Sequence, residues 1–461
     1  EGKDNALVDS ANIKSISHTI RVAQTQYNKW SKLDESERTT ERLLNMLNWD
    51  YFSLLDSLTI ARSRRHIEKY YNMNEIGKFP NRLKPKNIKV EIDEKENFPS
   101  MEMVNNEILR LRLAVYSPMK YILPNLRRLY SEKYDTIVAN GQVFKQTDRE
   151  NSLVHLMKSN LLKRLESSIF SFRLSLENII ENIDIHIQKI ESYNPDLHAS
   201  YDILSIDVED PELADALIGS KIKIIPKDVD LVRWKQDLLY DKEILLKILK
   251  QTKLVTPVRD KKLNRLKKLI DGKVKSPINE GNKKVLIFTA FADTAKYLYE
   301  NLHGWIKEKY NLHSALVTGS ENPKTTLKMN RVNFNNVLTN FSPLSKERDK
   351  VMPEIDEEID ILIATDCISE GQNLQDCDYL INYDIHWNPV RIIQRFGRID
   401  RLGSKNDDIQ LVNFWPSMEL DEYINLASRV KSRMTIMDIS STGEENVITE
   451  NSNEMKDLEY R

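Results

Sequence analysis

Two arginines near the end of the chain have a spacing that suits phosphate chemistry. Gln394, Gly397, Arg398 and Arg401 form the pattern Q-x-x-G-R-x-x-R within the segment QRFGRIDRLG. Phosphoryl transfer needs fixed positive charge around the oxygens of the transferred group, and arginine supplies it as a planar fork that is always charged. The pattern therefore indicates two candidate arginine fingers. Taken alone, it also fits a solvated or ion-paired helix face, on which arginines three residues apart are common.

Three loops upstream could place further polar groups beside these arginines. Short apolar runs are followed by Thr289-Ala290-Phe291, by the segment TDCISEGQNLQ at 365–375 and by the turn Trp387-Asn388-Pro389. In a parallel sheet, functional side chains gather in the loops at the carboxyl ends of the strands. We therefore expect these loops to meet at one edge of a sheet.

The elements needed to hold such loops are visible in the hydrophobic pattern after Gly281. Short apolar runs alternate there with helical stretches such as residues 293–310, which is the rhythm of βαβ units. The runs are KKVLIFTAF, HSALVTG, IDILIAT, DYLINYD and IQLVNFW. We expect an α/β domain with a parallel sheet and flanking helices at about 282–416, with a surface insertion at 333–359.

The remainder of the chain is mainly helical in pattern. The expected helices lie at 43–71, 160–183, 259–270 and 420–437. Ile88, Val90 and Ile92 alternate with polar residues as in a half-buried strand. An acidic segment at 196–215 is the best candidate for a flexible connection.

Composition limits the class of protein but does not identify a partner. A chain of 461 residues is long enough for at least two hydrophobic cores. Lys plus Arg number 68 against 70 Asp plus Glu, so any basic groove for nucleic acid must be local. The two cysteines, Cys367 and Cys377, form no C-x-x-C or Cys/His cluster, which indicates neither a disulfide framework nor a zinc site. Because no apolar run approaches about 18 residues, we expect a cytoplasmic protein without a membrane partner.

The pattern as a whole resembles motifs V and VI of superfamily-two helicase-like motors. It consists of the Q-x-x-G-R-x-x-R segment, the Trp-Asn-Pro turn and the loop Glu370-Gly371-x-Asn373-Leu374. Within that group, the turn and the loop look like the Swi/Snf family, and most like its bacterial branch. The resemblance is specific from about residue 283 to 415. It implies an α/β fold, namely a RecA-like second helicase lobe, preceded by a largely α-helical region.

The resemblance implies roles for individual residues. The catalytic residues that it implies, which would face the γ-phosphate of ATP, are Gln394, Arg398 and Arg401. The implied nucleotide-binding residues are Asp366, Glu370, Gly371 and Gly397. The implied nucleic-acid contacts are Thr289, Ala290, Phe291, Thr318, Gly319, Thr365, Asn373, Trp387 and Asn388.

Several of these residues also have a structural interpretation that the sequence leaves open. Phe291 and Trp387 could be aromatics of the core or of an interface between lobes. Thr318 could be a turn residue. Asp366 and Asp384, both at strand ends, could cap the helices that follow them.

A phosphate-cradling Walker A loop is missing from the sequence. The Gly-Lys pairs are Gly2-Lys3, Gly77-Lys78 and Gly272-Lys273, and none has the following hydroxyl residue or the upstream glycine of such a loop. A complete motor would bind ATP and Mg²⁺, whereas we expect this chain alone to bind neither tightly and to be inactive. Because residues 54–71 resemble the end of a first lobe and the chain begins with Glu1, we expect a fragment of a longer enzyme.

The resemblance divides the chain into four parts and leaves two candidate functions. The expected parts are the helical end of a first lobe (1–85), a mainly helical insertion and linker (86–270), the RecA-like lobe (271–418) and a C-terminal helix and tail (419–461).

The first candidate function is the C-terminal half of an ATP-dependent translocase or remodeller on double-stranded DNA. Its further partners would be the missing first lobe and either RNA polymerase or a defence or restriction complex. The alternative is a non-catalytic nucleic-acid-binding or regulatory subunit that acts with a partner ATPase.

Overall fold

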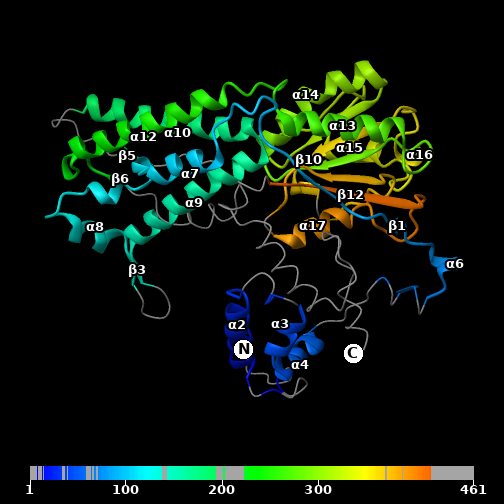
Figure 1. Cartoon of the computed structure of the whole chain (residues 1–461), viewed down its shortest axis with the longest axis horizontal. Helices are drawn as coiled ribbons and strands as arrows, with labels where there is room; N and C mark the ends of the chain where they lie inside the picture. Colours follow the sequence, from blue (N-terminus) through cyan, green and yellow to red (C-terminus); the bar gives the residue numbers. More distant parts are fainter. Residues whose placement is uncertain are drawn as a thin grey trace.

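The computed structural model describes most of the chain. The described residues are 8, 13, 15–33, 37–38, 40–58, 64, 67–68, 71–137, 143–193, 201–202, 223–368, 371–386 and 388–416. Figure 1 shows a helical arm on one side, a sheet with flanking helices on the other, and a small helical group near the N-terminus. Within the described ranges, no helix has both the length and the apolar character needed to cross a membrane.

The centre of the larger part is a mostly parallel sheet. Its main strands are β7 (Val285–Phe288), β8 (His313–Val317), β10 (Ile359–Ala364), β11 (Tyr379–Asn382) and β12 (Asp408–Trp415). They lie in the order β12-β11-β7-β10-β8, and each is parallel to its neighbours. The short β9 (Lys324–Thr325) pairs antiparallel with β8. All five apolar runs of the sequence form parallel strands, which confirms the predicted α/β fold.

Helices cover both faces of this sheet. They are α13 (Lys261–Lys275), α14 (Ala292–Tyr310), α15 (Phe334–Phe341) and α17 (Pro389–Phe396). Val285 and Ile287 of β7 belong to the core that α13 and α14 close, whereas Leu286 and Phe288 belong to the core that α15 and α17 close. Because successive side chains of a strand point to opposite faces, a strand covered on both sides must be apolar at every position.

Two short strands from the beginning of the chain extend the sheet. β1 (Asn81–Arg82) and β2 (Lys86–Lys89) both lie parallel to β12. The sequence predicted a strand around Ile88 but did not predict that it belongs to this sheet. β1 and β2 lie on either side of the boundary expected after residue 85. The expected domain boundaries stay predictions.

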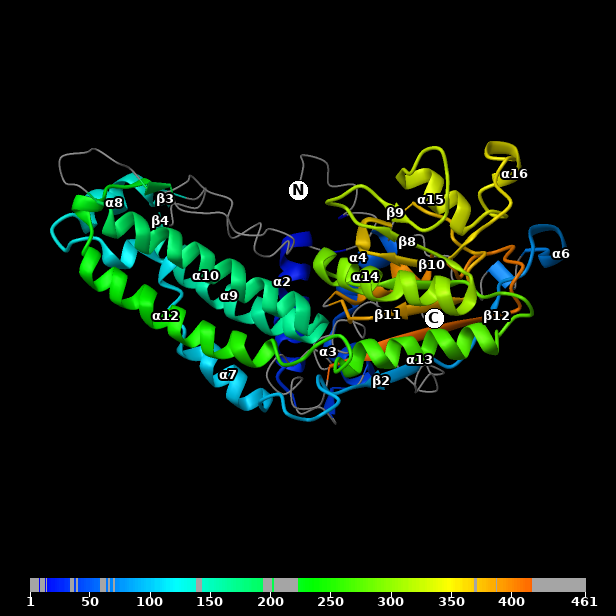
Figure 2. The ribbon, with the colours of Figure 1, turned by 90° about the horizontal axis from the view of Figure 1, so that it is seen from above.

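The helical arm projects from one end of the sheet (Figure 2). Its main helices are α7 (Met101–Arg110), α9 (Gln146–Ser167), α10 (Ile169–Glu191) and α12 (Leu231–Thr252). They enclose one apolar core, which includes Leu176 and Trp234. The single helix predicted at 160–183 is in fact two. Ser168 has an extended backbone between them, and its hydroxyl caps α10 by accepting from the Ser171 N–H at 3.0 Å.

Short elements connect these parts. They are α6 (Met73–Ile76), η2 (Ala114–Tyr116), η3 (Pro118–Tyr121), α8 (Arg127–Tyr134), β3 (Thr136–Ile137), β4 (Val143–Phe144), β5 (Tyr201–Asp202), β6 (Lys223–Ile224), η4 (Pro226–Asp228), α16 (Arg348–Val351) and η5 (Asp366–Ile368). The prediction of a surface insertion at 333–359 is wrong for its first part, because Val337, Leu338 and Phe341 of α15 are buried against the sheet. The rest of the segment contains α16, which has no buried residues, and ends where β10 begins.

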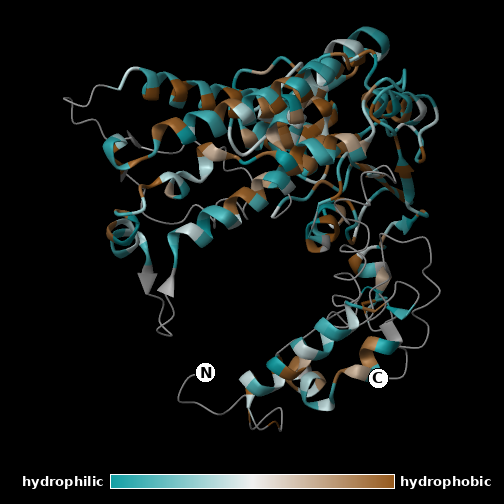
Figure 3. Ribbon diagram, turned by 60° about the vertical axis from the view of Figure 1, so that its left-hand side comes forward, coloured by the Kyte–Doolittle hydropathy of each residue, from teal (hydrophilic) through white to brown (hydrophobic). Residues whose placement is uncertain are grey.

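A small helical group precedes the sheet in sequence. It consists of α2 (Ile16–Trp30), α3 (Thr40–Met46) and α4 (Trp49–Leu58), packed around Trp30, Leu43 and Phe52. Figure 3 shows polar and apolar residues on different sides of these helices, as in amphipathic helices. The helices predicted at 43–71 agree with α3 and α4 up to Leu58. The expected connection at 196–215 lies mostly, and the expected helix at 420–437 wholly, outside the described residues.

Candidate nucleotide and nucleic-acid site

The two candidate fingers converge on one backbone carbonyl. Arg398 Nη1 and Arg401 Nη2 each donate to the carbonyl oxygen of Gln372 at 3.0 Å. Their Nε atoms donate to carbonyls four residues earlier, Gln394 O at 3.0 Å and Gly397 O at 3.2 Å. These four bonds orient both guanidiniums through neutral oxygens. Both side chains are half-buried.

The local backbone explains how the two arginines reach Gln372. Asn388 caps the start of α17 with its side-chain oxygen, and the helix ends at Gly397. The chain then runs beside the loop at 371–376, where the Leu374 N–H donates to the Arg398 carbonyl at 3.0 Å. This bond joins the predicted motif V loop to the predicted motif VI segment.

The end of the finger segment lies against the chain just before β1. The Gly403 N–H donates to the Lys78 carbonyl at 3.0 Å, and a Cβ atom on Gly77 would lie 2.8 Å from the Cα of Gly403. Gly77 and Gly403 have positive φ angles of 91° and 78°. Glycine is therefore required at Gly77 for close packing, and both positions have a backbone conformation that favours glycine.

Asp400, which lies between the two candidate fingers, is held by arginines from the beginning of the chain. Its carboxylate is 2.6 Å from Arg82 Nη2 and 3.4 Å from Arg64 Nη1, and its side chain is 6% exposed. Arg64 also pairs with Glu68 at 3.2 Å. These ion pairs attach the finger segment to the chain that precedes the sheet.

A third arginine, Arg395, has a different environment one turn earlier. Its side chain is fully buried and donates two hydrogen bonds to Asp366, from Nε at 2.6 Å and from Nη2 at 2.8 Å. Its Nη1 donates to the side-chain oxygen of Asn382 at 3.0 Å. The pair connects the loop after β10 to α17. Asp366, which the sequence predicted as a nucleotide ligand, thus forms an internal ion pair.

The buried Arg395 affects the pKa values of two neighbouring side chains, Asp366 and His386. Burial tends to raise the pKa of Asp366, but the charge and hydrogen bonds of Arg395 outweigh it, so that the pKa lies below its ordinary value. Burial and the positive charge of Arg395 together lower the pKa of His386. Asp366 is therefore ionised and His386 neutral at neutral pH.

Two predicted nucleic-acid contacts are held by a buried carboxylate beneath the helical arm. The Thr289 hydroxyl donates to Asp384 Oδ2 at 2.5 Å, and the Ala290 N–H donates to Asp384 Oδ1 at 2.7 Å. Ser167, at the end of α9, donates to the same carboxylate at 2.6 Å. Asp384 thus joins the loop after β7 to the arm.

Phe291 lies at the same junction. Its ring is 7% exposed, and the Arg164 guanidinium of α9 stacks over it at 4.9 Å from the ring centre. Arg164 also pairs with Asp293 at 2.9 Å. With Thr289 fully buried and Phe291 covered by the arm, neither side chain is accessible to nucleic acid in this arrangement. For Phe291, the core interpretation left open by the sequence describes the structure.

The loops after β8 and β10 lie side by side at the carboxyl edge of the sheet. The Thr365 N–H donates to the Val317 carbonyl at 3.2 Å, and a Cβ atom on Gly319 would lie 3.6 Å from the Cβ of Cys367. Thr318 and Thr365 are 7% and 8% exposed. Three of the predicted nucleic-acid contacts are therefore brought together here.

Asn373 and Asn388 have local structural roles. Asn373 Oδ1 accepts from the Gln375 N–H at 3.3 Å, and Asn388 Oδ1 accepts from the Val390 N–H at 3.1 Å. Asn388 is exposed, whereas Asn373 is half-buried. Their amides shape the ends of loops, and a contact with nucleic acid stays a prediction.

The other predicted residues lie near Arg398 and Arg401 or outside the described residues. Gly371 is exposed and has a φ of 73° next to Gln372. The side-chain oxygen of Gln394 is buried and has no hydrogen-bond partner in the part of the chain that the structure describes. Glu370 and Trp387 lie outside the described residues.

Sequence reasoning missed three residues that organise this site, namely Gln372, Arg395 and Asp400. Gln372 lies inside a loop that the sequence had singled out, so position alone could have indicated it. Arg395 and Asp400 belong to the alternating charges of QRFGRIDR. That pattern indicates ion pairs, but it does not show which arginine side chain is buried in the protein.

The sequence between 261 and 403 matches a known family. This range, which contains β7, β8, β10, β11 and both candidate fingers, matches the helicase conserved C-terminal domain. The uncharacterized ATP-dependent helicase YqhH of Bacillus subtilis is 47% identical over 66 residues, 14% of this chain and 12% of that protein. The RNA polymerase-associated protein RapA of Vibrio campbellii is 39% identical over 64 residues, 13% of this chain and 7% of that protein.

The matches cover only small parts of these two relatives. The matched segments span 12% of the Bacillus protein and 7% of the Vibrio protein. Among solved structures, the C-terminal part of the Fun30 ATPase domain aligns with 78% of this chain and 99% of its own, at 16% identity and a TM-score of 0.30, which is too low to support a shared arrangement. The family match covers strands β7, β8, β10 and β11 and the loops that follow them. The α/β part of this chain therefore resembles the C-terminal lobe of superfamily-two helicases, and its relatives include a Swi/Snf-like protein.

Proposed function

We propose that this chain is the C-terminal half of a nucleic-acid-dependent ATPase, in which Arg398 and Arg401 act as arginine fingers toward ATP held by another lobe. The observation that carries the proposal is the shared contact of both guanidiniums with the Gln372 carbonyl at 3.0 Å. A hydrogen bond to a charged acceptor is roughly twice as strong as one between neutral groups. A phosphate oxygen would therefore replace this carbonyl favourably.

The proposed chemistry is electrostatic. In phosphoryl transfer, negative charge spreads over the oxygens of the transferred group, and fixed cations stabilise it without reorganisation. Arg398 and Arg401 would supply those cations. Gln394, with an unpartnered side-chain oxygen in the described part of the chain, would add an amide to the same site. Arg395 would hold α17 in place beneath them through its pair with Asp366.

ATP and Mg²⁺ would need groups that this chain supplies only in part. Guanidiniums and amides suit phosphate oxygens, whereas Mg²⁺ takes oxygen ligands such as carboxylates and phosphates. We assign Mg²⁺ and the other phosphates to a lobe that carries a Walker A loop. This chain alone is then expected to bind neither tightly.

Double-stranded DNA is the proposed substrate and translocation the proposed motion, both supported by the Swi/Snf-like sequence. The adjoining loops that carry Thr318, Gly319 and Thr365 would lie toward the nucleic-acid backbone. A cytoplasmic location and RNA polymerase as a partner are proposed from the name of the Vibrio relative. A defence or restriction complex is the second proposed setting.

A non-catalytic binding or regulatory subunit is the alternative. The missing Walker A loop in this sequence fits both proposals. The alternative predicts that the chain binds DNA and alters a partner's activity without contributing groups to its nucleotide site.

ATP hydrolysis with and without double-stranded DNA separates the two. We expect no motor-like turnover by the purified chain, and DNA-stimulated turnover once the chain is joined to a lobe that carries a Walker A loop. Robust hydrolysis by the chain alone would contradict the proposed division of the site. A joined protein that binds DNA and ATP but hydrolyses none would favour the alternative.

A further inference from the structure

Lys346 lies in the predicted insertion at 333–359, outside the predicted motifs, yet it reaches the candidate fingers. Its Nζ donates to the side-chain oxygen of Gln372 at 2.8 Å. The backbone carbonyl of the same glutamine accepts from Arg398 and Arg401. Three cationic side chains from two separate segments therefore meet on one neutral residue.

We propose that Lys346 is a third cation of this site and contacts the terminal phosphate of a nucleoside triphosphate together with Arg398 and Arg401. The inference rests on the proposed function. It makes the insertion part of the nucleotide site, whereas the sequence predicted only a surface feature.

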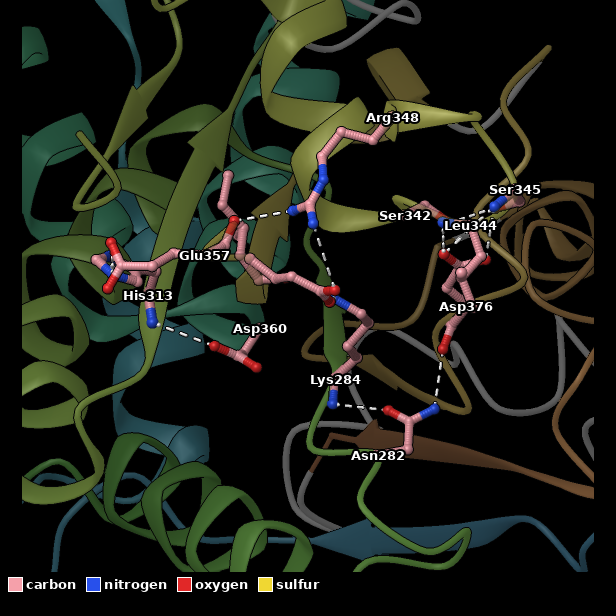
Figure 4. Close-up of polar contacts among 12 residues, drawn as sticks. Asn282, Lys284, His313, Ser342, Leu344, Ser345, Arg348, Glu357, Asp360 and Asp376 are labelled. Atoms are coloured by element: carbon pink, nitrogen blue, oxygen red, sulfur yellow. Dashed lines mark hydrogen bonds and ion pairs between the residues drawn. The ribbon is translucent and has the colours of Figure 1, made fainter. Parts of the chain in front are cut away.

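The backbone around Lys346 is anchored, so its side chain is directed toward Gln372. The N–H groups of Leu344 and Ser345 donate to the Asp376 carboxylate at 2.6 and 3.0 Å, as Figure 4 shows. The Lys346 N–H donates to the Ser342 carbonyl at 3.1 Å. The hydroxyls of Ser342 and Ser345 lie 2.6 Å apart in a hydrogen bond.

A second set of contacts fixes Asp376 and the far end of the insertion. The Asn282 side chain, just before β7, donates to the Asp376 carbonyl at 2.9 Å. Arg348 donates to the Glu357 carbonyl at 2.8 Å, which closes the insertion onto the start of β10 (Figure 4). The loop that presents Lys346 is thus tied to the sheet at both ends, and the lysine is positioned before any ligand arrives.

Lys346 and Arg401 carry like charges close to each other. Neither Lys346 nor Arg401 forms an ion pair with a carboxylate in the ranges that the structure describes. Burial lowers the pKa of Lys346, and the positive charge of Arg401 lowers it further. A phosphate group would remove this repulsion and accept hydrogen bonds from all three side chains.

In this arrangement Gln372 supplies the acceptors that a phosphate group would replace. Its carbonyl and its side-chain oxygen occupy the three donors with neutral acceptors, 2.8 to 3.0 Å away. Because the residue is next to Gly371, which has a positive φ angle, the loop can change its backbone conformation at that point. A ligand with several charged oxygens could take over all three donors at once.

Calorimetry at low salt tests the inference by measuring the affinity of the 461-residue chain for inorganic tripolyphosphate. Lys346→Gln should weaken binding roughly tenfold, the loss expected for one charge-assisted hydrogen bond, and Lys346→Arg should largely retain it. Arg398→Ala and Arg401→Ala should each weaken binding as well. The matched control is Lys350→Gln, on the same insertion, where the lysine is 66% exposed and pairs with Glu347.

The outcomes distinguish this inference from the proposed function. Unchanged affinity in Lys346→Gln, with losses in both arginine variants, would overturn the inference alone. Unchanged affinity in all three variants, or no binding by the unaltered chain, would overturn the proposed phosphate site too. An equal loss in Lys350→Gln would mean general attraction to the insertion and would also overturn the inference.

A local measurement on the unaltered chain gives a second test. Lysine amines can be labelled by reductive ¹³C-methylation, and the Lys346 signal is the one absent from Lys346→Arg. Tripolyphosphate should raise the apparent pKa of that amine, because an anion favours the charged form. A Lys346 signal that does not respond at saturating tripolyphosphate would overturn the inference.

Discussion

Arg395 and the pair Arg398 and Arg401 lie within seven residues of one another, but their surroundings are opposite. Arg395 is fully buried and bound by two hydrogen bonds to the carboxylate of Asp366. Arg398 and Arg401 are half-buried, and the carbonyl oxygens that orient them carry no net charge. Arg395 is paired with a carboxylate, whereas the other two arginines share a contact with the Gln372 carbonyl.

The difference indicates separate roles. A buried cation without a counter-ion is costly, so Arg395 needs Asp366 in every state of the protein. Cations held by carbonyls can exchange these acceptors for a charged ligand with a gain in hydrogen-bond strength. We therefore interpret the Arg395 pair as structural and the cluster around Gln372 as a phosphate site.

The largest expected effect comes from removing a finger. In a two-lobe enzyme, Arg398→Ala or Arg401→Ala should lower DNA-stimulated ATP turnover by about 10³ to 10⁵, the range for an arginine finger. Affinity for double-stranded DNA should stay nearly unchanged, because neither side chain would contact DNA.

Steady-state hydrolysis with saturating DNA, together with a DNA-binding titration, checks this prediction. The matched control is Lys405→Ala, an exposed cation four residues beyond Arg401. Turnover within tenfold of the unaltered enzyme would contradict the role of the arginine that was replaced.

The next effect separates the buried arginine from the fingers by stability. Arg395→Ala should lower the free energy of unfolding by about 3 to 5 kcal/mol, because it removes a fully buried arginine and leaves the half-buried Asp366 without its main partner. Arg398→Ala should cost only about 1 kcal/mol, the net value of ordinary hydrogen bonds. Urea denaturation of the chain measures both.

A double variant sharpens the same test. Arg395→Met with Asp366→Leu removes both charges, and apolar replacement of a buried ion pair is often close to neutral. The double variant should therefore be more stable than Arg395→Ala. Equal instability of the two variants would mean that shape, and not charge, explains the buried arginine.

A smaller effect is expected at Asp400, which connects the fingers to the beginning of the chain. Asp400→Asn keeps the shape but removes the charge that pairs with Arg64 and Arg82. Loss of these partly buried pairs should cost about 1 to 2 kcal/mol. An unchanged denaturation midpoint would show that the pairs add nothing to stability.

The smallest effect is a pH dependence that only the buried pair should show. The folded-state pKa of Asp366 is lowered, so its stabilising contribution is present above the unfolded-state pKa of about 3.9 and is lost as the pH falls through the lower folded-state pKa. The stability difference between the unaltered chain and Asp366→Asn should therefore shrink only below about pH 4. The corresponding difference for Arg401→Ala should stay flat across this range. Denaturation curves at several pH values would contradict the comparison if both differences changed alike.

The sequence was most informative where a pattern is local. Strands β7, β8, β10, β11 and β12 were predicted because strands buried on both faces must be apolar throughout. The candidate fingers could be singled out because their spacing and the nearby turn are read from neighbouring residues, and their role stays a prediction. The distinction between Arg395 and Arg398 was not predictable, since it depends on which side of α17 meets the loop after β10.

Other features depend on contacts between distant segments. β1 and β2 pair with β12 across more than 300 residues, and the strand predicted around Ile88 gave no sign of the sheet that it joins. The burial of Thr289 and Phe291 follows from the docking of the helical arm, which no motif encodes. Lys346 was missed for a similar reason, since an insertion carries no family pattern.

A structure of the two-lobe enzyme trapped with ADP and aluminium fluoride, a mimic of the transferred phosphoryl group, tests the central proposal most directly. The quantity to measure is the distance from the guanidinium nitrogens of Arg398 and Arg401 to the fluoride ligands. We predict hydrogen-bond distances of about 3 Å, with both guanidiniums moved off the Gln372 carbonyl. Guanidiniums that remain on that carbonyl, while other groups contact the fluoride, would contradict the assignment of Arg398 and Arg401 as fingers.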